Sequence, residues 1–268
     1  MIYHIAFPKL NINLTVSTVL TRFMGLTIYS YGAIIAIAFV AAYFYILKNC
    51  IKHSINENTM SSIILSATLC AILGARAYYV IFYPGDFYKK HPENIFMISE
   101  GGIAIYGAII GGILGTIIAA KMKNQPLKPT LDLLSLGVCL GQSIGRWGNF
   151  VNQEAFGSVT GSILGMASEN TGEQTVHPCF LYESAGCLAL FLILNFYYSK
   201  SKKIKHGNVF LIYTLGYGII RYFIEDLRTD SLIVPYTNIK ISQLLALATA
   251  IMSFCVLTKR FFPKINPN

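Results

Sequence analysis

Charged residues are scarce in this chain. Of its 268 residues only 12% are charged, whereas 54% are hydrophobic, and the mean hydropathy is +0.55. A soluble domain carries about 25% charged residues, so this composition argues against one. A bilayer core about 30 Å thick requires about 20 apolar residues per helix. The sequence therefore predicts an all-α, polytopic transmembrane helical bundle.

The chain also lacks the patterns that announce a cofactor. Its six cysteines include no close pair with the spacing of metal ligands, so no metal site is expected. Neither a phosphate-cradling loop nor a dinucleotide fingerprint occurs, so no organic cofactor is expected. Cys179 is expected outside the membrane, where disulfides can form. The sequence does not decide whether Cys179 is in one. The oligomeric state does not follow from the sequence.

Seven segments approach the length of a membrane-spanning helix and form one bundle over residues 1–268. They are residues 27–47, 61–84, 102–120, 131–147, 179–198, 208–226 and 239–258. An outer loop is expected over 148–178, in which residues 158–176 form either a lid over the site or a simple connection. No cleaved signal peptide is evident in the first 26 residues.

Basic residues outnumber acidic ones by 21 to 12, and they gather at alternate ends of the predicted helices. One example is the group Lys121, Lys123 and Lys128 between the third and fourth helices. Because cytoplasmic loops are rich in lysine and arginine, the N-terminus is expected outside and the C-terminus in the cytoplasm. The net charge of +9 then reflects membrane topology and anionic lipid, with no nucleic acid involved.

Polar residues interrupt the apolar pattern in the run from Gly145 to Gly157. This run contains Arg146, two asparagines (Asn149 and Asn152) and Glu154. An ionisable residue at membrane depth must be compensated by a partner or a function, so the run is a candidate site. Gly157 closes it and is expected in a turn that needs positive φ.

The unusual polar residues all fall at the outer ends of the predicted helices. Scattered residues that snorkel to the headgroups would divide between the two faces, so we expect these residues to converge on one cavity that opens toward the outer leaflet. They are Tyr31, Arg76, Tyr106, Arg146, Asn149, Arg221 and Glu225, with His177 in the outer loop.

Arg221, Glu225 and Arg228 are spaced i, i+4, i+7, which predicts one helix face with the carboxylate between two guanidiniums. One interpretation is a structural ion-pair ladder. The other is an anion clamp formed by Arg146 and Arg221, because guanidinium matches phosphate oxygens in a planar fork.

Three glycines, Gly107, Gly111 and Gly115, recur every fourth residue in the third predicted helix. Small residues at this spacing let two membrane helices approach closely. They predict a packing face and not a site.

Five segments together resemble the bacterial prolipoprotein diacylglyceryl transferases, over about residues 26 to 230. The two most specific are Gly145–Gly157 and Gly218–Glu225. The others are Ser30-Tyr31-Gly32, Gly74–Val80 and His177–Glu183. The resemblance implies transfer of a diacylglyceryl group from phosphatidylglycerol to the thiol of the lipobox cysteine in a prolipoprotein signal peptide, with release of glycerol phosphate. It implies a multi-pass protein of the bacterial plasma (inner) membrane, with its active site toward the outer leaflet.

For this reaction we hypothesise the following roles for the candidate residues. Arg146 and Arg221 would hold the phosphate, Asn149 and Tyr31 would position the lipid, and Glu154 and Glu225 would orient the arginines. Further contacts to phosphatidylglycerol are expected from Arg76, Asn152, Gly157 and Arg228. Which prolipoproteins are modified does not follow from the sequence.

One position departs from the family. Many members carry histidine where this chain has Tyr106. A histidine with a pKa of about 6.5 can accept a proton at neutral pH, whereas a phenol with a pKa of about 10 mostly donates a hydrogen bond. The identity of the general base is therefore undecided, and the candidates are Glu154, Glu225, His177 and Tyr106 itself. Alternatively, residue 106 only forms a hydrogen bond to the lipid.

Two other classes of function remain as alternatives. A transporter with an outward-facing anion site also uses intramembrane arginines. An intramembrane serine protease is the second, because Gly141–Gly145 reads G-x-S-x-G around Ser143, and His177 follows. In enzymes with this motif the serine lies on a nucleophile elbow, which is a strand-to-helix turn, whereas this segment is predicted to be helical.

Overall fold

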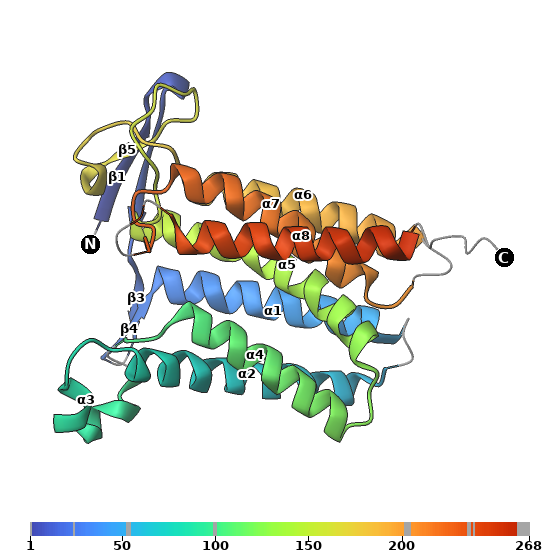
Figure 1. The fold of residues 1–268 in the computed structure, drawn as a ribbon. Helices are drawn as coiled ribbons and strands as arrows, with labels where there is room; N and C mark the ends of the chain where they lie inside the picture. Colours follow the sequence, from blue (N-terminus) through green and yellow to red (C-terminus); the bar gives the residue numbers. More distant parts are fainter. Residues whose placement is uncertain are drawn as a thin grey trace. The chain divides into compact units, whose positions relative to one another are not determined.

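The computed structural model describes residues 2–23, 25–51, 55–98, 101–200, 205–234, 237 and 239–261. Seven long helices lie at the positions of the seven predicted segments, which confirms the helical class (Figure 1). They are α1 (Ser30–Cys50), α2 (Glu57–Ile81), α4 (Ile105–Met122), α5 (Leu127–Asn152), α6 (Cys179–Lys200), α7 (Asn208–Leu227) and α8 (Ile241–Phe261). The helix α3 (Phe87–Lys90) is a single short turn. Because α5 continues to Asn152, the connection to α6 begins after that residue and not at 148.

Five of these helices are long and apolar enough to cross a membrane, namely α1, α2, α4, α6 and α8. The chain is thus of the multi-pass membrane class. The two remaining long helices, α5 and α7, carry charged residues within their length, such as Asp132 in α5 and Glu225 in α7. These same two helices supply most of the candidate site.

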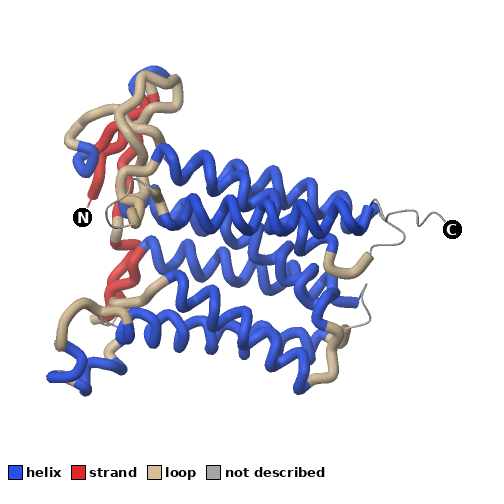
Figure 2. Tube along the Cα trace, viewed as in Figure 1, coloured by secondary structure: helices blue, strands red, loops and turns tan. Residues whose placement is uncertain are grey.

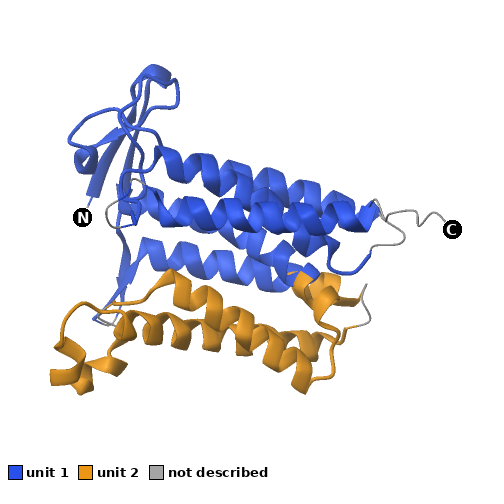
Figure 3. Cartoon of the chain, in the orientation of Figure 1, with its two compact units in different colours: residues 1–45, 132–268 blue, residues 46–131 orange. Residues whose placement is uncertain are grey.

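The chain divides into two compact units, residues 1–45 with 132–268 (unit 1) and residues 46–131 (unit 2) (Figure 3). In unit 2, α2 packs against α4 through glycines. A Cβ added to Gly74 would lie 2.5 Å from the carbonyl oxygen of Gly107, and one added to Gly115 would lie 2.6 Å from the Cβ of Cys70. The predicted packing role of the glycine stripe in α4 is confirmed.

The N-terminal residues form strands, which were not predicted from the sequence (Figure 2). Strand β1 (Ile2–Phe7) pairs antiparallel with β2 (Ile12–Ser17) on one side and with β5 (Ala167–Ser168) on the other. Strands β3 (Val19–Phe23) and β4 (Leu26–Tyr29) form a separate hairpin that leads directly into α1. Apolar and polar residues alternate in Ile12–Ser17, which is the period of a strand, although every residue of β2 except Val16 is exposed.

A small apolar core joins the three-stranded sheet to the ends of α5 and α6. Its buried residues are Ile5, Phe7, Phe150, Met166, Val176 and Phe180. Residues 158–176 belong to this layer, because Met166 and Val176 exchange backbone hydrogen bonds of 3.0 and 2.8 Å. The backbone N–H of His4 donates to the carboxylate of Glu169 and lowers the pKa of that group. In unit 1 the layer lies at the end of the helices where α1 begins and α5 and α7 finish (Figure 1).

Asp132 fixes the start of α7 against α5. Its buried carboxylate accepts the backbone N–H of Gly207 at 2.6 Å and that of Phe210 at 2.8 Å. The first N–H groups of a helix have no partner within it, so a carboxylate there supplies acceptors and complements the helix dipole. The cap sets the register of α7 beside α5, on which the site depends.

Candidate functional site

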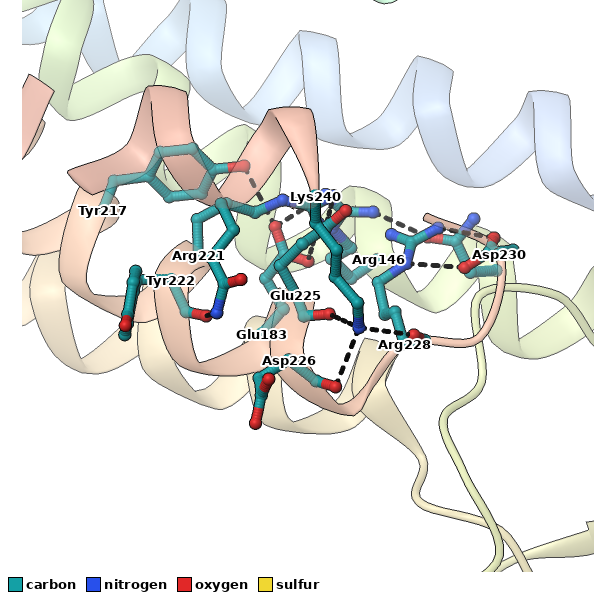
Figure 4. A network of polar contacts seen from close by, with 12 residues as sticks. Arg146, Glu183, Tyr217, Arg221, Tyr222, Glu225, Asp226, Arg228, Asp230 and Lys240 are labelled. Atoms are coloured by element: carbon teal, nitrogen blue, oxygen red, sulfur yellow. Dashed lines mark hydrogen bonds and ion pairs between the residues drawn. The ribbon is translucent and has the colours of Figure 1, made fainter. Parts of the chain in front are cut away.

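Glu183 of α6 lies at the centre of a polar cluster between three helices (Figure 4). Its Oε1 accepts hydrogen bonds from Arg146 Nη2 of α5 at 2.6 Å and from the Tyr217 hydroxyl of α7 at 3.0 Å. Its Oε2 accepts a bond from Arg221 Nη1 of α7 at 3.1 Å. Glu183 is only 1% exposed, so its charge depends on these donors for compensation. Together with Glu225, these residues are called the Glu183 cluster below.

Arg221 also binds Glu225, one turn further along α7. The Nη2 to Oε2 distance is 2.5 Å, and the i, i+4 spacing on one helix face is as predicted. The side chains of Glu183 and Glu225 are 2% exposed, whereas those of Arg146 and Arg221 are 23% and 17% exposed. Two carboxylates therefore lie at the base of the cluster, and the two guanidiniums that they neutralise remain partly accessible.

Arg228 does not extend the helix face, in contrast to the prediction. Helix α7 ends at Leu227, and Arg228 has extended backbone angles. Its guanidinium binds Asp230 in a bidentate manner, with Nε to Oδ1 at 2.9 Å and Nη2 to Oδ2 at 2.7 Å. This bonding lowers the pKa of the Asp230 carboxyl, while partial burial opposes the shift. Glu225 is thus paired with Arg221, and Arg228 is paired with Asp230.

Lys240 closes the C-terminal end of α7 (Figure 4). Its Nζ donates to the carbonyl oxygens of Glu225 at 2.7 Å and of Asp226 and Arg228 at 2.9 Å each. The last carbonyls of a helix lack partners within it, and a cation there is favoured by the dipole. Lys240 therefore positions the turn that carries Glu225 and Arg228.

A second set of contacts runs from Arg146 along the end of α5. Arg146 Nη1 donates to Asn149 Oδ1 at 3.3 Å, and Asn149 Nδ2 donates to Glu154 Oε1 at 2.8 Å. The ring of Tyr31 in α1 lies against Gly148, since a Cβ there would come within 2.8 Å of it. The structure thus brings together four residues that the sequence predicted as site residues, namely Tyr31, Arg146, Asn149 and Glu154.

Gly157 is required for close packing and not for a positive φ, so that expectation was wrong. A Cβ at Gly157 would lie 2.8 Å from both Cys179 Sγ and the carbonyl oxygen of Leu227. Its backbone N–H donates to the carbonyl of His177 at 2.8 Å. Positive φ occurs before it, at Gln153 (52°) and at a second residue, Ala155 (56°). Gly157 lets the end of α7 approach the start of α6.

A cavity of about 310 Å³ opens beside this part of unit 1. Its lining includes the carboxyl-bearing residues Glu154 and Asp230, together with Gln153, Ala155, Phe156, Asn170 and Thr229. Glu154 is exposed, and it reaches Arg146 through Asn149. The cavity therefore adjoins the guanidiniums through a continuous set of hydrogen bonds.

The residues of the predicted serine-protease alternative do not form a nucleophile elbow. Ser143 lies inside α5, where its hydroxyl donates to the carbonyl of Leu140 at 2.7 Å. His177 contacts the hydroxyl of Tyr182 through Nδ1 at 3.2 Å. An elbow needs a strand-to-helix turn that exposes the serine, and a helix interior does not provide one.

Arg76 and Tyr106 belong to unit 2, whereas the Glu183 cluster belongs to unit 1. Arg76 donates to four carbonyl oxygens, those of Asn94 at 2.6 Å and of Ile95, Gly101 and Gly102 at 2.8 Å. Tyr106 is the second residue of α4, and its ring lies 6.4 Å from that of Tyr78. The convergence of these two residues with the others stays a prediction, as do the roles of Asn152, the last residue of α5, and of His177.

Glu183, Tyr217 and Lys240 were not predicted as site residues from the sequence. Glu183 had a clear signal, because it is the one carboxylate within the predicted helix 179–198. An ionisable residue inside an apolar helix marks a functional candidate. Tyr217 and Lys240 gave no comparable signal, since both act through contacts between α7 and other segments.

Within the described residues, no group of three or more histidine, cysteine, aspartate or glutamate side chains could hold a metal ion. All six cysteines are free, and Cys179 is buried beside Gly157. The thiol of Cys179 therefore packs in the structure and forms no disulfide there.

Comparison with known proteins gives a consistent result. Residues 18–259 match the model of the prolipoprotein diacylglyceryl transferase family. A phosphatidylglycerol–prolipoprotein diacylglyceryl transferase from Finegoldia magna is 40% identical over 227 residues, which cover 85% of this chain and 89% of the relative. The enzyme of the same name from Staphylococcus aureus strain Newman is 37% identical over 246 residues, which cover 88% of this chain and 86% of the relative.

Proposed function

The chain belongs to the prolipoprotein diacylglyceryl transferase family, and on that premise we propose how its residues carry out the reaction. Its relatives are named for phosphatidylglycerol and prolipoprotein, which are the two substrates of this chain. The enzyme transfers a diacylglyceryl group from the lipid to the protein. The accepting atom is the sulfur of the lipobox cysteine in the precursor's signal peptide.

One observation carries the assignment of the phosphate site. Arg146 and Arg221 present partly exposed guanidiniums above two buried carboxylates, Glu183 and Glu225. A guanidinium has five N–H donors, and among the described residues the contacts of Arg146 and Arg221 with carboxylate and amide oxygens engage their Nη1 and Nη2 atoms and do not engage Nε. Donors therefore remain for a phosphate, for which the planar fork is well suited. The buried carboxylates hold both forks in a fixed orientation before the lipid arrives.

The chemistry needs no nucleophile from the enzyme, because the attacking sulfur belongs to the substrate. The sulfur forms a bond to the glycerol carbon that carries the phosphate, and the bond from that carbon to the phosphate oxygen breaks. The products are a thioether and glycerol phosphate, and the thiol proton passes to a base. Negative charge grows on the departing phosphate, and the arginines stabilise it.

Glu154 is the carboxylate that we assign to accept the thiol proton. It lines the cavity of about 310 Å³, whereas Glu183 and Glu225 are buried and paired with arginines. Through Asn149 it also orients Arg146. A thiol with a pKa of about 8.5 is a few per cent ionised at pH 7, so a neighbouring guanidinium and a base both favour the thiolate.

The residues of the Glu183 cluster lie near the ends of α5 and α7 and the start of α6. These helix ends lie on the side of unit 1 where α1 begins (Figure 1). We assign this end to the outer face of the bacterial plasma membrane. The distribution of lysine and arginine supports this orientation, and an exported precursor reaches the enzyme from that side. A transport path would need polar residues reaching both faces, and the polar cluster at one end does not favour it.

The test is a transfer assay with purified protein, phosphatidylglycerol and a lipobox peptide, analysed by mass spectrometry. We expect a diacylglyceryl adduct on the cysteine and release of glycerol phosphate in equal amount. A parallel reaction with phosphatidylcholine as sole lipid should give no adduct. Absence of adduct from well-folded protein with phosphatidylglycerol would overturn the proposed function.

A further inference from the structure

A second cavity lies between the N-terminal strands and the ends of α5 and α6. Its volume is about 200 Å³, and apolar side chains line it throughout. Ile12 and Leu14 of β2 form one wall, and Trp147 and Phe150 of α5 form another. This cavity is separate from the one lined by Glu154 and Asp230. Neither the phosphate site nor the transfer chemistry uses it.

The wall on β2 follows from the alternation of a strand. Ile12 and Leu14 are two residues apart, so they project from the same face of β2. They are 42% and 43% exposed, which is unusual for a leucine or isoleucine that faces a core. By contrast Phe150 and Phe180 beneath them are 8% and 2% exposed and form the floor. The cavity is therefore an open apolar recess on a packed base.

The recess is continuous with the Glu183 cluster along two helices. Phe150 lies one turn after Arg146 on α5, and Phe180 lies one turn before Glu183 on α6. The rings of Phe150 and Phe180 are 5.2 Å apart, and Arg146 and Glu183 are joined by the 2.6 Å ion pair. An extended segment that reaches the guanidiniums thus passes within about one helical turn of the recess.

We propose that the recess docks an apolar side chain from the signal peptide of the prolipoprotein, close to the reacting cysteine. This inference rests on the proposed function and adds where the peptide binds. Signal peptides carry an apolar run of about 7–15 residues before their small-residue segment. The recess matches such a side chain in polarity, and its position lets the adjoining cysteine reach the phosphate site.

The occupant is a peptide and not an acyl chain of the lipid. The recess is walled by β2, which lies beyond the ends of the helices in the strand layer (Figure 2). Among the described strands, β2 pairs with β1 alone, so its other edge offers backbone groups to an extended peptide. An acyl chain has no hydrogen-bonding groups to use at that edge.

Trp147 is the single tryptophan of the chain, and it lines the recess at 44% exposure. Its fluorescence therefore reports occupancy directly. The probe is a lipobox peptide in which serine replaces the cysteine, added to protein in phosphatidylcholine nanodiscs. We expect saturable fluorescence changes with a blue shift, absent in Trp147→Phe and absent for a peptide whose apolar residues are replaced by serine. The same change produced by phosphatidylglycerol without peptide would overturn the choice of occupant.

Kinetics of a recess variant give the second test. Leu14→Ala removes a branched side chain from the wall, and Leu20→Ala on β3 is the matched control because Leu20 is exposed and lies outside the recess. We expect Leu14→Ala to raise KM for the peptide about tenfold. This is the low end of the effect of one methylene group in a hydrophobic pocket, because Leu14 is only partly buried. KM for phosphatidylglycerol and kcat should stay at wild-type values.

The outcomes separate the two proposals. If wild-type protein transfers the diacylglyceryl group but Leu14→Ala and Leu20→Ala have the same peptide KM, the recess proposal fails and the proposed function stands. If Leu14→Ala changes KM for the lipid, the recess holds an acyl chain and the peptide proposal is overturned. If wild-type protein binds the peptide at Trp147 but transfers nothing, the proposed function fails.

Discussion

Replacing Glu183 with glutamine is the sharpest perturbation of the polar cluster. The carboxylate accepts from Arg146 and Tyr217 on Oε1 and from Arg221 on Oε2. Glutamine is nearly the same size, and its amide oxygen can keep the two donors on Oε1. Its amide nitrogen, however, would face the N–H of Arg221, donor against donor. The formal charge of the two arginines and two glutamates also changes from zero to +1.

The size of the effect follows from these contacts. A hydrogen bond to a charged group contributes about 1.5–3 kcal/mol, and removing one partner of a buried ion pair costs about 3–5 kcal/mol. Arg221 retains Glu225, so we expect the lower part of that range, about 3 kcal/mol, in the free energy of unfolding. If the same energy is lost from the transition state, kcat falls about a hundredfold.

The assay combines single-turnover transfer with thermal unfolding in detergent. Glu173→Gln is the matched control, because Glu173 is exposed in the connection between α5 and α6 and should leave both measurements unchanged. Tyr217→Phe serves as a milder variant, since it removes one hydrogen bond and keeps the charge of Glu183, and about a tenfold loss of kcat is expected. Wild-type kcat and stability in Glu183→Gln would refute the view that this carboxylate anchors both arginines.

Two further predictions concern Gly157, which packs against the end of α7, and Asp230, which lies in the turn after α7. Gly157→Ala places a Cβ 2.8 Å from Cys179 Sγ and should lower the free energy of unfolding by about 1–3 kcal/mol. The control is Gly161→Ala, which should be neutral because residue 161 has open space around it. Equal thermal stability of the two variants would contradict the packing role of Gly157. The pKa of Asp230 is lowered by Arg228, so its stabilising contribution should be complete at neutral pH and be lost as pH falls below about 4 through the folded pKa. Comparing Asp230→Asn with wild type between pH 7 and pH 2 checks this, and an advantage of wild type that persists at pH 2 would count against it.

The positions of the seven long helices could be predicted from the sequence, because five of them are apolar runs long enough to cross a membrane and α5 and α7 contain shorter apolar stretches. Spacing along one helix was also informative, as the pair of Arg221 with Glu225 shows. Arg228 was misplaced because the i, i+7 argument assumed a helix that in fact ends at Leu227. A spacing rule holds only as far as the helix extends, and the end of α7 depends on Lys240, which is distant in sequence.

The N-terminal strands escaped prediction for a different reason. Strand β1 pairs with β5 more than 150 residues away, and the core that β1 shares with Phe150 and Phe180 forms only when α5 and α6 meet. The central role of Glu183 likewise arises from three helices at once. Local patterns identified the arginines, whereas the carboxylate that joins them is defined by tertiary contacts.

The central claim is that Arg146 and Arg221 together hold the phosphate that leaves. The most direct test is the single-turnover rate of diacylglyceryl transfer in Arg146→Ala and Arg221→Ala, with Arg22→Ala, an exposed arginine of β3, as control. Loss of one such donor is expected to cost about 3 kcal/mol, or about a hundredfold in rate, and Arg22→Ala should match wild type. Wild-type rates in both cluster variants, with folding intact, would contradict the account.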